Sequence, residues 1–160
     1  MNSQQLEQFY RERSYTKVFA YPLWTIYLEP KQYYLGWVFA WANRPDCYDV
    51  TLTTPEEWQE LHQIIQDTKT VFASFLRPEL VNVSFLGNMS RHCHCHIIPR
   101  YKEPVSFDGD LFADENFGQH YNQTNTQYRE TLHPIRFEKL RSHLRSEEHT
   151  SELQSLACIS

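Results

Sequence analysis

The sequence has little glycine, no long apolar run and no excess of basic residues, and each shortage excludes a class of protein. Its 160 residues include four glycines, at positions 36, 87, 109 and 118. No two of them lie close enough to form a glycine-rich phosphate loop, which excludes the Walker and dinucleotide-binding fingerprints. Asp and Glu outnumber Lys and Arg by 20 to 15. This acidic balance gives no electrostatic footprint for a nucleic-acid partner.

Membrane and export signals are also missing. No stretch approaches the ~20 apolar residues that span a bilayer, and the first residues lack the basic region and apolar run of a secretory signal. Cys93 and Cys95 form a C-x-C pair, unlike the C-x-x-C of zinc or redox sites. We therefore expect no membrane partner and a location in the reducing cytoplasm.

Aromatic residues, by contrast, make up 15% of the chain, more than a disordered chain contains, so we expect it to fold. Its length of 160 residues favours one domain that can bury a real core. Apolar periodicity predicts a short helix over residues 3–13 and a long helix from 55 to about 76. Thr54, Pro55 and Glu57 give the long helix a capping box with proline at its first position. Strands are predicted over 24–28, 33–42, 81–85 and 92–98, followed by a long ordered loop over 101–128 and a short helix over 134–144.

The last sixteen residues differ from the rest. Residues 145–160 resemble the conceptual translation of a common sequencing adapter, so we exclude them from fold reasoning as an artefact. The expected organisation is a single domain over 1–144 and a disordered tail over 145–160. An ordinary polar C-terminal helix is the alternative interpretation.

Three of the eight histidines lie in the segment His92-Cys93-His94-Cys95-His96. Alternate side chains of a strand share one face, so the three imidazoles would project to one side and the cysteines to the other. A row of polar rings on one face is costly unless the rings are bonded or used.

Two chemical uses of this row are open. Histidine is the commonest metal ligand, and two neighbouring rings such as His92 and His94 could bind one ion. However, His92 and His96 would be ~13 Å apart along the strand, too far to share it. Alternatively, a neutral imidazole attacks phosphorus while its neighbours hold phosphoryl oxygens.

The segment His92-Cys93-His94-Cys95-His96-Ile97-Ile98, followed by Pro99-Arg100-Tyr101, resembles the signature of the histidine triad (HIT) nucleotide hydrolases and transferases. The resemblance covers about residues 23–121. It includes the Leu52–Trp58 helix start and a Phe107–Tyr121 pattern similar to a diadenosine polyphosphate hydrolase-like branch. It implies an α+β fold, with an antiparallel sheet of about five strands, one long helix and a short N-terminal helix.

The resemblance also implies roles. His94 matches the nucleophile that forms a nucleotidyl-histidine intermediate at the α-phosphate. His96 matches the histidine that contacts phosphate near the leaving group, and His92 the one that orients the nucleophile. Asn88 matches a phosphate-binding side chain, and Ser90 is a second candidate donor. The implied activity is cleavage of a dinucleoside polyphosphate or a related nucleotide.

Some positions depart from the family pattern. Gly36-Trp37 stands where many members have Gly-His, and Asn43-Arg44-Pro45 where many have Lys-Arg-His, which leaves substrate preference open. The alternatives are a nucleoside phosphoramidase, a non-catalytic nucleotide-binding protein and the metal-dependent protein described above. The sequence requires no cofactor or resident metal. It leaves open a divalent cation bound with the substrate phosphates, and a homodimer.

Overall fold

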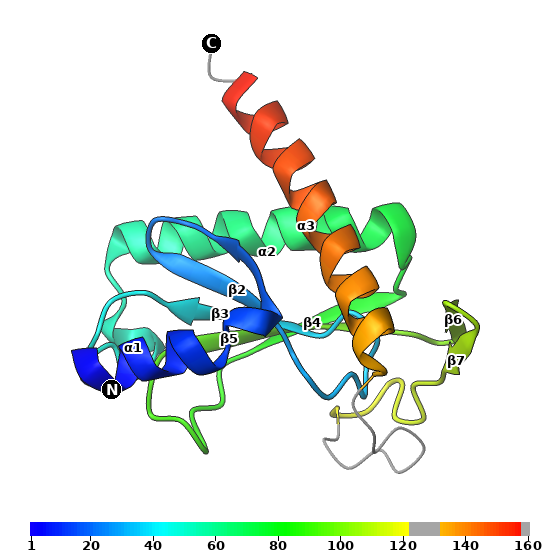
Figure 1. Cartoon of the computed structure of the whole chain (residues 1–160), viewed down its shortest axis with the longest axis horizontal. Helices are drawn as coiled ribbons and strands as arrows, with labels where there is room; N and C mark the ends of the chain where they lie inside the picture. The colour runs from blue at the N-terminus through cyan, green and yellow to red at the C-terminus, as the bar shows by residue number, and fades with distance from the viewer. Residues whose placement is uncertain (122–131, 158–160) are drawn as a thin grey trace.

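The computed structural model describes the backbone of residues 1–121 and 132–157, with side chains as far as Arg145. A five-stranded antiparallel sheet has the order β1-β2-β3-β5-β4 (Figure 1). Its strands are β1 Lys17–Ala20, β2 Trp24–Leu28, β3 Val38–Ala42, β4 Leu80–Ser84 and β5 His94–Arg100. The predicted α+β class and five-stranded sheet are confirmed.

Two helices lie on opposite sides of this sheet. The short helix α1, Ser3–Glu12, and the long helix α2, Pro55–Phe75, are separated by the strands in Figure 1. A third helix, α3 Pro134–Ala157, crosses near the end of α2. Two 3₁₀ turns, η1 Ser14–Thr16 and η2 Val50–Leu52, and a hairpin of β6 Val105–Phe107 with β7 Asp110–Phe112, complete the described elements.

The start of α2 follows the predicted capping box. Thr54 Oγ1 accepts a hydrogen bond from the Glu57 amide at 3.2 Å, and the Thr54 amide donates to Glu57 Oε2 at 2.8 Å. Glu57 also holds the Arg44 guanidinium, at 2.7 Å. Two orphan amides of the first turn are thereby satisfied, and the helix is tied to the chain that follows β3.

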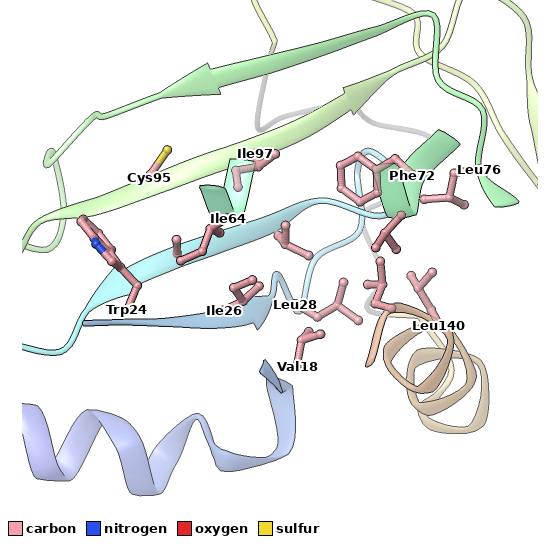
Figure 2. Close-up of a cluster of buried hydrophobic side chains, with 14 of the residues drawn as sticks. Val18, Trp24, Ile26, Leu28, Ile64, Phe72, Leu76, Cys95, Ile97 and Leu140 are labelled. Atoms are coloured by element: carbon pink, nitrogen blue, oxygen red, sulfur yellow. The ribbon is translucent and has the colours of Figure 1, made fainter. Parts of the chain in front are cut away.

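The main core fills the space between the sheet and α2 with α3 (Figure 2). Alternate residues of three neighbouring strands point into it, as the period of two requires. They meet apolar residues of both helices. The fully buried members include Trp24, Ile26, Leu28, Ala40, Cys95, Ile97, Ile64, Phe72 and Leu140.

The strands differ from the sequence prediction at several points, including a one-residue shift of β4 from the expected 81–85. β5 begins at His94 and continues through Pro99 to Arg100, because its pairing with β4 extends to Leu80. Pro99, which has no amide N–H, lies beyond the pairing with β3, which ends at Ile97. β3 begins only at Val38, because the preceding segment turns at Gly36. The φ of +89° at Gly36, with Leu76 packed against its Cα, excludes a side chain there. β1 was not predicted, since it is short and its register is irregular.

The C-terminal part also departs from expectation. The helix expected to end near Leu144 instead runs on to Ala157. The reason is local: no glycine or proline follows Pro134 to stop it. The β6–β7 hairpin lies in the predicted 101–128 loop. The remainder of that loop from residue 122, and residues 158–160, lie outside the described residues. No helix in the described part of the chain is long and apolar enough to cross a membrane.

Candidate active site

An open pocket of about 380 Å³ lies on the face of the sheet opposite α2. Its floor is formed by β3 and β5, where Phe39 pairs with His96 and Trp41 pairs with His94. The segment between β4 and β5 supplies one wall, and α1 supplies another through Phe9. The pocket therefore collects side chains from the start, the middle and the triad segment of the sequence.

His94 presents an unprotonated ring nitrogen to this pocket. Its Nδ1 lies 2.7 Å from the main-chain oxygen of His92. A carbonyl oxygen only accepts, so Nδ1 carries the proton and Nε2 keeps its lone pair in the neutral ring. Burial lowers the pKa of His94 below its usual value, which favours the neutral form. The imidazole is thus prepared to act as a nucleophile.

His96 lies next to His94 on the same face, with ring centroids 5.0 Å apart. The indole Nε1–H of Trp37 donates to His96 Nδ1 at 3.2 Å. Burial, and then the neighbouring His94, lower the pKa of His96 to about 4. Both pocket histidines are therefore neutral near pH 7.

His92 has a different environment from the other two. It precedes β5, is fully buried and does not line the pocket. Its Nε2 donates to the Ala42 main-chain oxygen at 2.8 Å, and its ring stacks on Trp41 with centroids 4.7 Å apart. Burial lowers its pKa also. Its contact with the nucleophile is made by its main-chain oxygen rather than by its ring.

Asn88 and Ser90, the two predicted substrate-binding residues, both line the pocket together with His94 and His96. They lie in the connection between β4 and β5, which Gly87 opens with a φ of +61°. Four of the five predicted site residues therefore line one pocket, and the fifth, His92, is buried next to the pocket without lining it.

Several lining residues were missed by sequence reasoning. Trp41 stacks on Phe9 of α1, with centroids 3.9 Å apart, and on His94 at 5.2 Å. The alternation of Trp37, Phe39 and Trp41 was the available signal. It became informative only once β3 was known to pair with the triad strand. The other missed lining residues are Arg13, Glu29, Lys31, Tyr33, Leu86 and Met89.

Two arginines outside the pocket, Arg100 and Arg44, bind other residues of the scaffold. Arg100 is 2% exposed and forms two hydrogen bonds to Asp114, at 2.6 and 3.1 Å. Its remaining donors reach Asn82 and the main-chain oxygens of Asn116 and Gln119. Arg44 is held by Glu57. Neither side chain lines the pocket.

Metal binding by the triad meets a geometric obstacle. The pairing of His92 with His94 fails because the His92 Nε2 proton is directed to Ala42 and its Nδ1 is buried. Within residues 1–121 and 132–145, His, Cys, Asp and Glu form no group of three suited to an ion. Cys93 and Cys95 point into the core, where burial raises the pKa of Cys95 to about 12. They serve as small apolar residues.

Comparison with solved structures identifies the fold. A protein from Sulfolobus tokodaii described as a hypothetical histidine triad nucleotide-binding protein is 14% identical and superposes with a TM-score of 0.66, covering 92% of both chains. A histidine triad protein from Marinobacter aquaeolei is 15% identical, with a TM-score of 0.65, covering 88% of this chain and 94% of the other. A zinc-bound histidine triad protein from Mycobacterium smegmatis is 14% identical, with a TM-score of 0.56 and coverage of 88% and 87%.

These similarities define a class. The chain has the fold of the histidine triad proteins, with its own His-x-His-x-His segment at the start of β5. No family model matches the sequence. No curated protein matches it either. The structural likeness therefore shows the architecture that holds the candidate site.

Proposed function

We propose that this protein is a nucleotide hydrolase or nucleotidyltransferase of the histidine triad type, which cleaves a dinucleoside polyphosphate or a related nucleotide at the α-phosphate. The observation that carries this proposal is the hydrogen bond from His94 Nδ1 to the His92 main-chain oxygen. It leaves the Nε2 lone pair of a neutral, partly buried ring in an open pocket. The nucleotide-binding protein from Sulfolobus tokodaii has the same fold.

In the first step, His94 Nε2 attacks the α-phosphorus. A P–N bond forms, and the P–O bond to the remaining phosphate chain breaks. The leaving phosphate takes the bonding electron pair and departs as an anion. Water then attacks the phosphorus of the nucleotidyl-histidine. A new P–O bond forms, the P–N bond breaks, and its electron pair returns to His94 Nε2, which restores the neutral ring. The nucleoside monophosphate leaves, and the proton lost by water passes to solvent. The His92 main-chain oxygen stabilises the positive charge that develops on His94.

The remaining predicted residues bind the substrate. Asn88 and Ser90 lie on the same wall as the triad and offer uncharged donors to phosphate oxygens. His96 contacts the phosphate near the leaving group. Aromatic residues such as Phe9 and Trp41 provide a surface on which a nucleobase can stack. No resident cofactor is needed for these steps, and a divalent cation would enter with the polyphosphate. We propose a cytoplasmic location and leave a homodimer as an option.

Two alternatives use the same pocket. A phosphoramidase would break a P–N rather than a P–O bond with the same nucleophile. A non-catalytic nucleotide-binding protein would retain the pocket without turnover, but the tautomer of His94 favours chemistry. A panel of adenylated substrates, including a nucleoside phosphoramidate, separates these possibilities by product analysis.

The decisive experiment traps the intermediate. The protein is mixed with diadenosine polyphosphate, quenched in base and analysed by intact mass. We expect one added adenylyl group that maps to His94 and is absent from His94→Ala. Turnover by His94→Ala at the rate of the unchanged protein would refute the proposal. Chelation before mixing tests the metal-dependent alternative, which requires loss of activity.

A further inference from the structure

Trp37 makes a directional contact that the proposed chemistry does not yet use. Its indole Nε1–H donates to Nδ1 of His96, and the indole is 2% exposed. The two rings meet edge to face, with centroids 5.5 Å apart. An indole nitrogen can donate but cannot accept, so His96 Nδ1 must be the acceptor in this bond.

This contact determines which His96 nitrogen carries the proton. A neutral imidazole has one donor and one acceptor, so Nδ1 acceptance leaves the proton on Nε2. An imidazolium would place a second N–H against the indole N–H. His96 is therefore held neutral, with an N–H donor at Nε2. His94 has the opposite arrangement, with its proton on Nδ1 and its lone pair at Nε2.

The position of Trp37 is itself firmly fixed. Its ring packs edge to face against Tyr34 and Tyr121, at 6.1 and 5.9 Å. The Tyr121 hydroxyl is hydrogen-bonded to Ser84 at 2.9 Å, and Ser84 pairs with His96 across the sheet. The indole donor is thus oriented by both the turn before β3 and the segment that returns across β4.

We infer that Trp37 is a positioning residue, whose indole N–H holds His96 as a hydrogen-bond donor toward phosphate oxygen and prevents it from acting as a base. The expected effect of Trp37 on the reaction rate rests on the proposed function, whereas its effect on the His96 tautomer does not. The adjacent histidines then have complementary roles: His94 supplies the electron pair, and His96 supplies the N–H that faces the charge formed on the leaving phosphate.

The tautomer can be measured without any substrate. Long-range ¹H–¹⁵N spectra of histidine-labelled protein assign the protonated nitrogen of each ring, with His96→Gln used to identify its signals. We expect the unchanged protein to show His96 protonated at Nε2 alone. A His96 ring protonated at Nδ1 would overturn the inference, even if the proposed activity were present.

Trp37→Phe removes the donor and keeps an aromatic ring. We expect the ¹⁵N chemical shift of His96 Nδ1 to change. We also expect the pKa of His96 to rise, because the neutral ring loses the hydrogen bond that it accepts from the indole. The titration is followed together with the neighbouring ionisable groups, since His94, Glu29, Lys31 and Arg13 line the same pocket. An unmoved Nδ1 signal in folded Trp37→Phe would also overturn the inference. If that variant does not fold, the tautomer of the unchanged protein decides.

A matched control is available in Trp41→Phe. Trp41 stacks on His94, but its indole nitrogen has no hydrogen-bond partner among the described residues. This substitution makes the same change of ring within the same pocket, and we expect the His96 tautomer and Nδ1 signal to remain as they were. A shift equal to that of Trp37→Phe would attribute the effect to ring packing and overturn the inference.

Kinetics supply a second readout. Removing a hydrogen-bond donor to the transition state lowers kcat by roughly 10²–10³-fold. Trp37→Phe leaves the His96 donor in place but no longer orients it, so we expect a smaller fall in kcat, of about threefold to tenfold. KM should change by less than about twofold, since uniform binding is retained. Trp37→His, which restores a ring N–H, should recover part of kcat. A rise in KM alone would contradict a positioning role. Absence of any turnover in the unchanged protein would refute the proposed function and leave the tautomer result standing.

Discussion

The two faces of the sheet contrast in their side chains although they are formed by the same strands. On the α2 side, Cys95 and Ile97 of β5 are sealed in an aliphatic core. On the other side, His94 and His96 from the same strand lie among aromatic rings in an open pocket. One residue of shift along the strand would exchange the two sets. Stability and chemistry are therefore assigned to alternate positions of one seven-residue segment.

The contrast predicts that a change on one face should affect activity and a change on the other should affect folding. The face of the sheet opposite α2 bears the neutral rings of His94 and His96 and the indoles of Trp37 and Trp41 in the pocket, with the buried ring of His92 packed beside them. Burying such polar rings costs free energy unless they are hydrogen-bonded. Two buried ring nitrogens, of Trp41 and His92, lack partners among the described residues. The covered face has no comparable cost, so it must supply the stability that the pocket does not.

The largest effect is expected on the open face, from His94→Ala. Removal of the nucleophile should lower turnover of a dinucleoside polyphosphate by at least about 10³-fold. Thermal unfolding should change little, because the ring lies beside a cavity rather than in the core. Chromatographic measurement of the nucleoside monophosphate formed gives the turnover rate, and calorimetry gives the change in thermal unfolding. His62→Ala, an exposed histidine of α2, is the matched control and should retain full activity. An equal loss of turnover in both variants would contradict the assignment of activity to the face that bears His94.

The complementary change is Ile97→Ala on the covered face. Ile97 has no exposed surface, so the substitution should lower the free energy of unfolding by about 2–5 kcal/mol. Activity per folded molecule should remain close to that of the unchanged protein. Denaturant titration provides the first value, and rates below the melting temperature provide the second. Ile135→Ala, at a position 71% exposed, should cost far less. A folded but inactive Ile97→Ala variant would show that the covered face also determines activity, and would contradict the division between the two faces.

A smaller effect on the covered side is expected at the start of α2. Thr54→Ala removes the oxygen that accepts from the Glu57 amide, and should cost about 0.5–2 kcal/mol. Chemical denaturation measures this loss. Thr70→Ala within the same helix is the control, since alanine has the higher helix propensity there. An equal loss at both positions would show that the cap contributes nothing specific.

The sequence predicted the local features well and the long-range ones poorly. The capping box at Thr54, the bounds of β2 and the two-sided character of the triad segment depend on neighbouring residues, and local patterns report them. The position of Trp41 beside His94 depends on strand pairing, which no local pattern encodes. The burial of His92 depends on its contacts with Ala42 and Trp41 of β3, and the extension of β5 through Pro99 depends on its pairing with β4.

The candidate site divides in the same way. Histidine spacing singled out His92, His94 and His96, the family resemblance singled out Asn88, and the position of Ser90 in the short connection made it a further candidate. The structure places His94, His96, Asn88 and Ser90 around one pocket. The sequence could not indicate that the main-chain oxygen of His92 would accept a hydrogen bond from His94, since that depends on where β5 begins. Nor could it place Phe9, which reaches the pocket only because α1 folds back onto the sheet.

The smallest predicted effect concerns acid pH on the open face. Protonation of His94 at Nε2 removes the lone pair that attacks phosphorus, so activity should fall as the ring becomes charged. A ring with a pKa of ~6.5 would be about one-quarter neutral at pH 6, and the rate would fall about fourfold from its plateau. Burial lowers the pKa of His94, so the loss at pH 6 should be less than this.

The kcat/KM profile from pH 5 to 8 measures this limb, because it reports ionisation of the free enzyme. A dinucleoside polyphosphate is the suitable substrate, since it has no terminal phosphate that titrates near pH 6. Burial raises the pKa of Glu29 in the same pocket, so Glu29→Gln is the control that should leave the limb in place. Folded fraction is recorded at each pH, because neutral buried histidines also make folding less favourable once the unfolded chain protonates below ~6.5. A limb centred at or above 6.5 in fully folded protein would show that the open face does not hold His94 neutral, and the contrast between the faces would lose its electrostatic basis.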